Sequence, residues 1–232
     1  MTSITILGSC RQDSLYNNYR ITSLKNNISY PHYSKEILQL INFCLNNNIL
    51  EEETKYIFRS AILSNSTIKW SESLKNEVLN TDVFIIEIAS RISYSYNDKY
   101  VHHILYDDTK YNNNYKNKIT VRDLTDEEIE NDIDELCNIL NNRNNIKKNN
   151  IIIVGHIVTK PSGKRYDLLC LLENICNKKN IPFINPVKEI TKRGHRILDL
   201  VNTNEHHINH YNDRGHSIIG NIYRDFIDKI KV

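Results

Sequence analysis

The sequence has few of the residues that interrupt regular structure, with six glycines, four prolines and a single tryptophan in 232 residues. No stretch approaches the roughly 20 consecutive apolar residues of a membrane-spanning helix, so we expect no membrane partner. A long basic stripe is absent too, and thirty Lys and Arg against twenty-eight Asp and Glu give a net charge of +2. Nothing in this charge pattern calls for nucleic acid as a partner.

The five cysteines are odd in number and form no C-x-x-C pair, which disfavours a disulfide framework and cysteine-bound zinc. Residues 1–8 lack the basic start and the apolar length of a secretory signal. We therefore expect free thiols in a reducing, cytoplasmic compartment. The abundance of Asn, Ile, Lys and Tyr is typical of AT-rich genomes, such as those of some intracellular parasites and large DNA viruses.

Apolar runs alternate with helical patterns along the chain. The runs predict strands at 4–7, 83–88, 151–155 and 181–184. Helical spacing predicts helices at 34–45, 51–63, 71–79, 125–140, 166–177 and 215–230, the first capped by Ser34 and the fourth by a capping box. A long Tyr- and Asn-rich connection is expected from 93 to about 118. The alternation predicts one domain over residues 1–232, a three-layer α/β/α fold with a mostly parallel sheet.

The turn after the first strand, Gly8-Ser9-Cys10-Arg11, is the first candidate site, because parallel sheets bind ligands beyond the carboxyl ends of their strands. A glycine permits a sharp turn there, and a small nucleophile can project above the sheet. Cys10 is the stronger nucleophile, since Arg11 beside it favours the thiolate. Ser9 takes that role if the turn is shifted by one residue. The alternative is a buried cysteine at a strand end, with Ser9 capping the backbone.

His210 is the predicted base for this nucleophile. It is followed five residues later by Gly215, which opens a terminal amphipathic helix. This block and the first turn resemble the SGNH (GDSL-like) hydrolase superfamily, in which the first strand ends in Gly-Asp-Ser. The resemblance implies a flavodoxin-like SGNH-hydrolase fold. It also implies that Ser9 takes the aspartate's place, Cys10 the nucleophile's place and His210 that of the catalytic histidine.

The chain departs from that superfamily at two positions. The aspartate three residues before the histidine is replaced by His207. Another carboxylate could then orient His210, or the site works as a dyad; the candidates are Glu205, Asp199 and Asp213. The oxyanion block Gly-x-Asn is replaced by Ala89-Ser90-Arg91, with Arg91 in the asparagine's place. The chain thereby resembles branches with Gly-Ser-Cys at the first block, namely GSCFA-like domains and a capsule-polysaccharide acetyltransferase family that uses cysteine and histidine.

We therefore predict covalent acyl transfer by an esterase or O-acyltransferase. His210 takes the proton of Cys10, and the thiolate attacks an ester or thioester carbonyl. Backbone N–H groups at Gly8 and Cys10, helped by Ser90 or Arg91, stabilise the oxyanion. The acyl group then passes to water or to a hydroxyl of a small molecule or glycan.

Other features leave alternatives open. No cofactor is expected, although the basic rim at 160–165 could attract the phosphorylated tail of an acyl-CoA co-substrate. His156, directly after Gly155, faces the site if the third strand ends there, and is otherwise a surface histidine or one that supports the site residues from behind. One alternative function is a non-catalytic carbohydrate- or protein-binding module that kept the fold. Another is a metal-dependent hydrolase using the histidines of 206–216, but no metal is expected. The sequence says nothing about oligomeric state.

Overall fold

A central five-stranded sheet organises the chain in the computed structural model, which describes residues 2–15, 19–22, 24–112, 115–144, 150–202 and 210–230. Its strands are β1 (Ser3–Leu7), β2 (Arg20–Ile21), β3 (Val83–Ile88), β7 (Ile151–Gly155) and β8 (Phe183–Ile184). They lie in the order β2-β1-β3-β7-β8, and every pairing is parallel. Numbered by their appearance in the chain, these strands follow the 2-1-3-4-5 order of flavodoxin-like sheets, as predicted.

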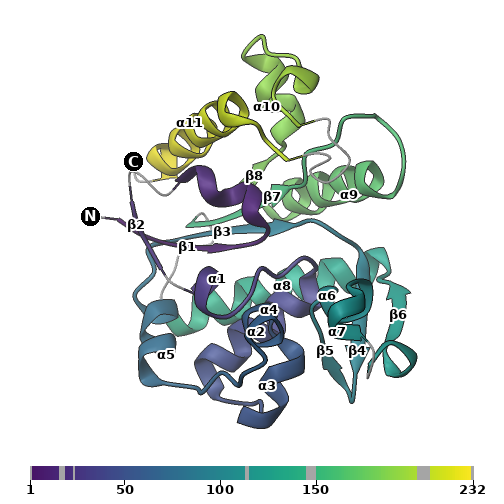
Figure 1. Ribbon diagram of the computed structural model, residues 1–232. Helices are drawn as coiled ribbons and strands as arrows, with labels where there is room; N and C mark the ends of the chain where they lie inside the picture. Colours follow the sequence, from purple (N-terminus) through teal and green to yellow (C-terminus); the bar gives the residue numbers. More distant parts are fainter. Residues whose placement is uncertain are drawn as a thin grey trace.

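Both faces of the sheet are covered, because successive side chains of a strand point to opposite sides. Ile85 and Val154 belong to the apolar cluster that includes α10 (Pro186–Lys192) and α11 (Asp213–Ile230). Ile86 and Ile153 belong to a second cluster, whose main helices are α2 (Ser34–Asn46), α5 (Glu72–Leu79), α8 (Asp126–Asn144) and α9 (Lys164–Lys179). In Figure 1, α10 and α11 lie on one side of the sheet and α2, α5 and α8 on the other. The predicted three-layer α/β/α architecture is confirmed.

The two predicted helix caps have different outcomes. At the start of α8, the Thr125 N–H donates to Glu128 at 2.9 Å and the Glu128 N–H donates to the Thr125 hydroxyl at 3.1 Å, which is the predicted capping box. The cap predicted for α2 was wrong. Tyr33 is its N-cap residue, and the hydroxyl of Ser34 donates instead to Asp132 of α8 at 2.6 Å. Ser34 therefore joins two helices rather than closing the end of one.

The predicted helix at 51–63 is two helices, α3 (Glu51–Ile57) and α4 (Arg59–Ser64). The break is at Phe58, whose backbone is extended with φ −96° and ψ 137°. Its ring is fully buried and packs against Phe43 of α2, with ring centroids 5.0 Å apart. Burial of this large ring explains why tertiary packing overrides the helical pattern here.

The long connection predicted at 93–118 contains regular structure, so that prediction was wrong. It holds parts of a second, antiparallel sheet of three strands in the order β5-β4-β6, formed by β4 (Ile92–Tyr96), β5 (Lys99–Tyr100) and β6 (Thr120–Asp123). Asn97 and Asp98 form the hairpin turn with φ of 48° and 60°, a conformation that Asn and Asp tolerate well. Two short helices follow, α6 (Ile104–Asp107) and α7 (Thr109–Asn112).

The first turn of the chain is held by the last helix. The short 3-10 helix η1 (Cys10–Leu15) follows β1 and packs against α11. Ser14 and His216 are hydrogen-bonded at 2.8 Å, and a Cβ on Gly220 would lie 2.8 Å from the Ser14 carbonyl oxygen. Only a glycine allows this close approach, so η1 is fixed against α11.

The remaining short elements are α1 (Leu24–Asn27), η2 (Lys116–Lys118) and η4 (Ile197–Asp199). Among the described helices, none combines the length and apolar character needed to cross a membrane.

Candidate functional site

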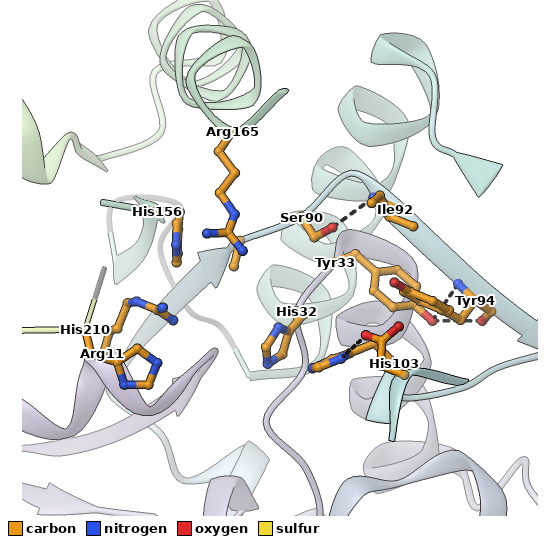
Figure 2. Close-up of a pocket in the computed structure, with 12 residues that line it drawn as sticks. Arg11, His32, Tyr33, Ser90, Ile92, Tyr94, His103, His156, Arg165 and His210 are labelled. Atoms are coloured by element: carbon orange, nitrogen blue, oxygen red, sulfur yellow. Dashed lines mark hydrogen bonds and ion pairs between the residues drawn. The ribbon is translucent and has the colours of Figure 1, made fainter. Parts of the chain in front are cut away.

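A cavity of about 290 Å³ opens where the parallel strands β1, β3 and β7 end. Its lining residues directly follow the strands, with Arg11 after β1, Ser90 after β3 and His156 after β7, and they are joined by Arg165 and His210. Figure 2 shows these side chains around one space. An adjoining cavity of about 300 Å³ shares some of these residues and is also lined by Ser9. The two cavities therefore lie at the strand ends where the sequence predicted a site.

Gly8 brings the turn after β1 against β3. Its φ is +150°, and a Cβ at this position would lie 2.6 Å from the Cβ of Glu87. Any other residue would have to displace the backbone of one strand. Because the two strands approach so closely, the Glu87 carboxylate reaches the next residue, Ser9. The Ser9 N–H and hydroxyl both donate to Glu87 Oε2, at 2.8 and 2.5 Å.

Glu87 is the centre of the buried polar network, and it is only 1% exposed. Burial would raise the pKa of this carboxyl, but the hydrogen bond from His156, the charge of Arg11 and the hydrogen bond from Ser9 hold it well below its usual range. Glu87 is therefore an ionised carboxylate with three hydrogen-bond donors. Glu87 was not predicted as a site residue, although a single carboxylate inside the apolar strand 83–88 was a signal in the sequence.

His156 lies on the other side of this carboxylate. Its Nδ1 is 3.0 Å from Glu87 Oε1, and the residue is 3% exposed. Burial lowers the pKa of His156 to about 4, so the ring is neutral at pH 7 and its proton is assigned to Nδ1, facing the carboxylate. Nε2 then carries a lone pair, and it is buried with no hydrogen-bond partner in the described part of the chain. A surface position for His156 is therefore wrong, whereas its hydrogen bond to Glu87 fits the alternative that it supports the site from behind.

The hydroxyl of Ser9 is fully engaged. It donates to Glu87 and accepts from the Arg11 guanidinium at 3.3 Å, and the residue is buried. A carboxylate with a lowered pKa is a weak base, so this arrangement fixes the turn but does not activate Ser9 for attack. Cys10 follows as the first residue of η1, and its side chain lies outside the described part of the structure.

His210 lines both cavities together with Arg11, although the two residues come from opposite ends of the chain. Its backbone carbonyl accepts a hydrogen bond from the Asn202 N–H at 2.8 Å, next to the isolated bridge between Val201 and Tyr211. These contacts fix the backbone from which the imidazole projects. Glu205, one of the acids considered for orienting His210, lies outside the described residues.

Ser90 and Arg91 behave differently from each other. Ser90 lines the cavity, with its N–H donating to the His32 carbonyl at 3.0 Å and its Oγ accepting from the Ile92 N–H at 2.9 Å. Its hydroxyl proton remains able to donate. The guanidinium of Arg91 instead pairs with Asp126 and donates from Nε to the Leu124 carbonyl at 3.3 Å. These two acceptors hold Arg91 outside the lining of the cavity, so the structure does not support an oxyanion role for Arg91.

Three histidines line the cavities and form the one group within the described ranges whose ligand atoms cluster like those of a metal site. His32, His102 and His103 bring one such atom each to within 4.8 Å of one another. His102 uses both ring nitrogens on the backbone, one 3.1 Å from the Tyr30 carbonyl and the other accepting from the Ile104 N–H at 3.2 Å. A metal would have to replace one of these bonds, so the trio fits a metal poorly.

Only two of the four histidines considered as a metal cluster at 206–216 are described, namely His210 and His216. His216 is hydrogen-bonded to Ser14, and His210 lies beside Arg11 at the cavities. His206 and His207 lie outside the described residues.

No protein-family model and no curated protein matches the chain. Among solved structures, an α/β-hydrolase enzyme from the metagenome of Lake Arreo is similar over 99% of this chain and 96% of its own, with 13% identity and a TM-score of 0.47. A catalytic mutant of an acetylxylan esterase from Geobacillus stearothermophilus is similar over 97% and 94%, with 11% identity and a TM-score of 0.44. At such scores the likeness says nothing about the chemistry of this chain.

Proposed function

We propose that the protein is an acyl-transfer enzyme, an esterase or O-acyltransferase, with Cys10 as nucleophile and His210 as base. The observation that carries this proposal is that His210 lines the same cavity as Ser9 and Arg11, the two neighbours of Cys10. A cysteine and a histidine that meet beside a cationic guanidinium are the parts of an activated thiolate.

The reaction begins when His210 accepts the thiol proton of Cys10. The thiolate forms a bond to the carbonyl carbon of an ester or thioester, and the resulting tetrahedral oxyanion collapses. The bond to the leaving group breaks, and the imidazolium of His210 gives its proton to that group. In the second half, His210 takes a proton from water or a hydroxyl acceptor. The acceptor oxygen attacks the acyl-cysteine, and the thiolate of Cys10 is restored.

The oxyanion needs hydrogen-bond donors that are still available. The hydroxyl of Ser90 lines the cavity and has its proton to give, whereas Arg91 is held by Asp126. Ser90 and backbone N–H groups at the turn are therefore the proposed donors. Glu87 is a positioning residue, because it holds the Ser9 amide and hydroxyl and so fixes the backbone that carries Cys10.

The test is hydrolysis of p-nitrophenyl acetate near neutral pH, with intact-mass detection of an acetylated protein. We expect Cys10→Ala and His210→Ala to lose turnover by at least about 100-fold, because a general base contributes on that scale. Ser9→Ala is the matched control for the neighbouring hydroxyl and should still be acetylated. Full turnover by Cys10→Ala, or acetylation on another residue, would overturn the proposal.

Two rival functions give distinct results in the same assay. Loss of turnover on adding a chelator would indicate a metal-dependent hydrolase. A folded wild-type protein that is never acetylated would indicate a binding module. The ion pair of Arg91 with Asp126 favours this alternative, because it removes one candidate oxyanion donor from the site.

A further inference from the structure

One end of the 290 Å³ cavity is strongly cationic. Arg11 enters it from η1, and Arg165 enters it from the second residue of α9. Figure 2 shows the two side chains reaching the cavity from different elements, with His156 beside Arg165. Two guanidinium groups that face one space repel each other unless a negative charge lies between them.

The described residues provide no free carboxylate at this end. Asp107 lines the cavity but is hydrogen-bonded to His103 at 2.8 Å. Glu87 is not among the lining residues, and its carboxylate already accepts hydrogen bonds from Ser9 and His156. Arg165 forms no hydrogen bond and no ion pair with any residue in the described ranges. Desolvation, followed by the nearby charge of Arg11, lowers the pKa of Arg165, and the charge of Glu87 offsets only part of this effect.

Two further features face the same end. His156 Nε2 is a buried polar atom with no partner in the described part of the chain, and its residue lines the cavity. The 16-residue helix α9 starts here, and its N-cap Gly163 has no side chain to bond the first N–H groups. A helix N-terminus favours negative charge. The acidic Asp167 in the first turn of α9 satisfies part of that preference but does not line the cavity.

We propose that Arg11, Arg165 and the start of α9 bind an anionic oxygen group, a phosphate or a carboxylate, that the substrate carries away from its reacting carbonyl. This inference rests on the proposed acyl transfer for its role, because it defines the substrates as acidic acyl donors or acceptors. Arginine suits the task, since its planar fork bonds two oxygens of such a group at once. The neighbouring Nε2 of His156 accepts a hydrogen bond from a donor on the same substrate.

The experiment measures binding without turnover. Inorganic phosphate and acetate are titrated separately into the Cys10→Ala protein by calorimetry, so a failure of the catalytic proposal leaves the result readable. We expect phosphate or acetate to bind, and Arg165→Gln to weaken that binding by about tenfold, the value of one charge-assisted hydrogen bond. The preferred anion identifies phosphate or carboxylate as the group recognised.

Lys164→Gln is the matched control, because it removes the same charge one residue earlier. Lys164 is exposed and is paired with Asp123 at 2.7 Å, away from the cavity lining. The affinity of the Lys164→Gln variant for the anion should stay within about twofold of that of the Cys10→Ala protein. Absence of binding by either anion, or equal losses in Arg165→Gln and Lys164→Gln, would overturn the inference. Arg165→Lys should recover part of the affinity, since the charge is kept and the two-pronged contact is lost.

Discussion

Replacing Glu87 by glutamine tests whether the buried carboxylate assembles the turn after β1. Three donors point at it in the native protein, namely the Ser9 N–H, the Ser9 hydroxyl and the Nδ1–H of His156. A glutamine keeps the shape but has only one acceptor oxygen. Its NH₂ group must then face at least one of these donors in a buried site, and that donor loses its partner.

The magnitude follows from these contacts. A buried donor left without an acceptor costs about 1–3 kcal/mol, and breaking a buried charged hydrogen-bonded pair costs about 3–5 kcal/mol. The neutral glutamine does not carry the desolvation penalty of the buried carboxylate. This relief offsets part of the lost hydrogen bonding, so the two costs do not simply add. We expect Glu87→Gln to lower the free energy of unfolding by about 3–5 kcal/mol at pH 7.

Urea unfolding followed by circular dichroism measures this loss. With an unchanged slope, the midpoint should fall by about 1–2 M. Glu36→Gln is the matched control, because Glu36 is equally buried but burial raises the pKa of its carboxyl to about 8, so it is mostly protonated at pH 7. A glutamine resembles that neutral group and should cost less than about 1 kcal/mol. Equal costs for the two variants would refute the assignment of charge to Glu87.

Three other predictions concern residues with well-defined surroundings. Because the pKa of Glu36 is raised, its wild-type contribution is complete below about pH 4.5 and falls as pH rises toward 8, so urea titrations should show Glu36→Gln gaining stability over wild type across this interval. Gly8→Ala should lower the melting temperature by several degrees, at a cost of about 2–4 kcal/mol, because its Cβ would meet Glu87; a neutral result would contradict the close approach of the two strands. Arg91→Ala should keep kcat/KM for ester hydrolysis within about threefold, because Asp126 already holds its guanidinium; a 100-fold loss would restore its oxyanion role.

Much of the sheet could be predicted from the sequence because its strands are buried on both faces. The largely apolar and fully buried strands β1, β3 and β7 leave little choice of element, and the segments between them are long enough for crossovers. The small sheet was missed for the opposite reason. The alternation of Ile, Ser and Tyr in β4, followed by Asn97 and Asp98, is a hairpin pattern, but its polar character resembles that of a loop.

The site was predictable only in part. Residues that follow strand ends, such as Arg11 and His156, were found because the topology brings those ends together. Glu87 and Arg165 were not found, since their importance depends on which side chain faces them across the sheet edge. Arg91 illustrates the same limit, because its position in the chain resembles that of an oxyanion donor but Asp126, far along the sequence, captures its guanidinium.

The contact between η1 and α11 has a consequence for the order in which the protein is made. Ser14 is hydrogen-bonded to His216, and Gly220 fits against the Ser14 backbone, so the turn after β1 is secured by a helix that lies 202 residues later in the chain. A growing chain can pair β1 with β3 and β7 long before α11 exists. During synthesis this turn would therefore stay without the support of α11 until that helix has been made, and chains that stop before α11 would lack the contact.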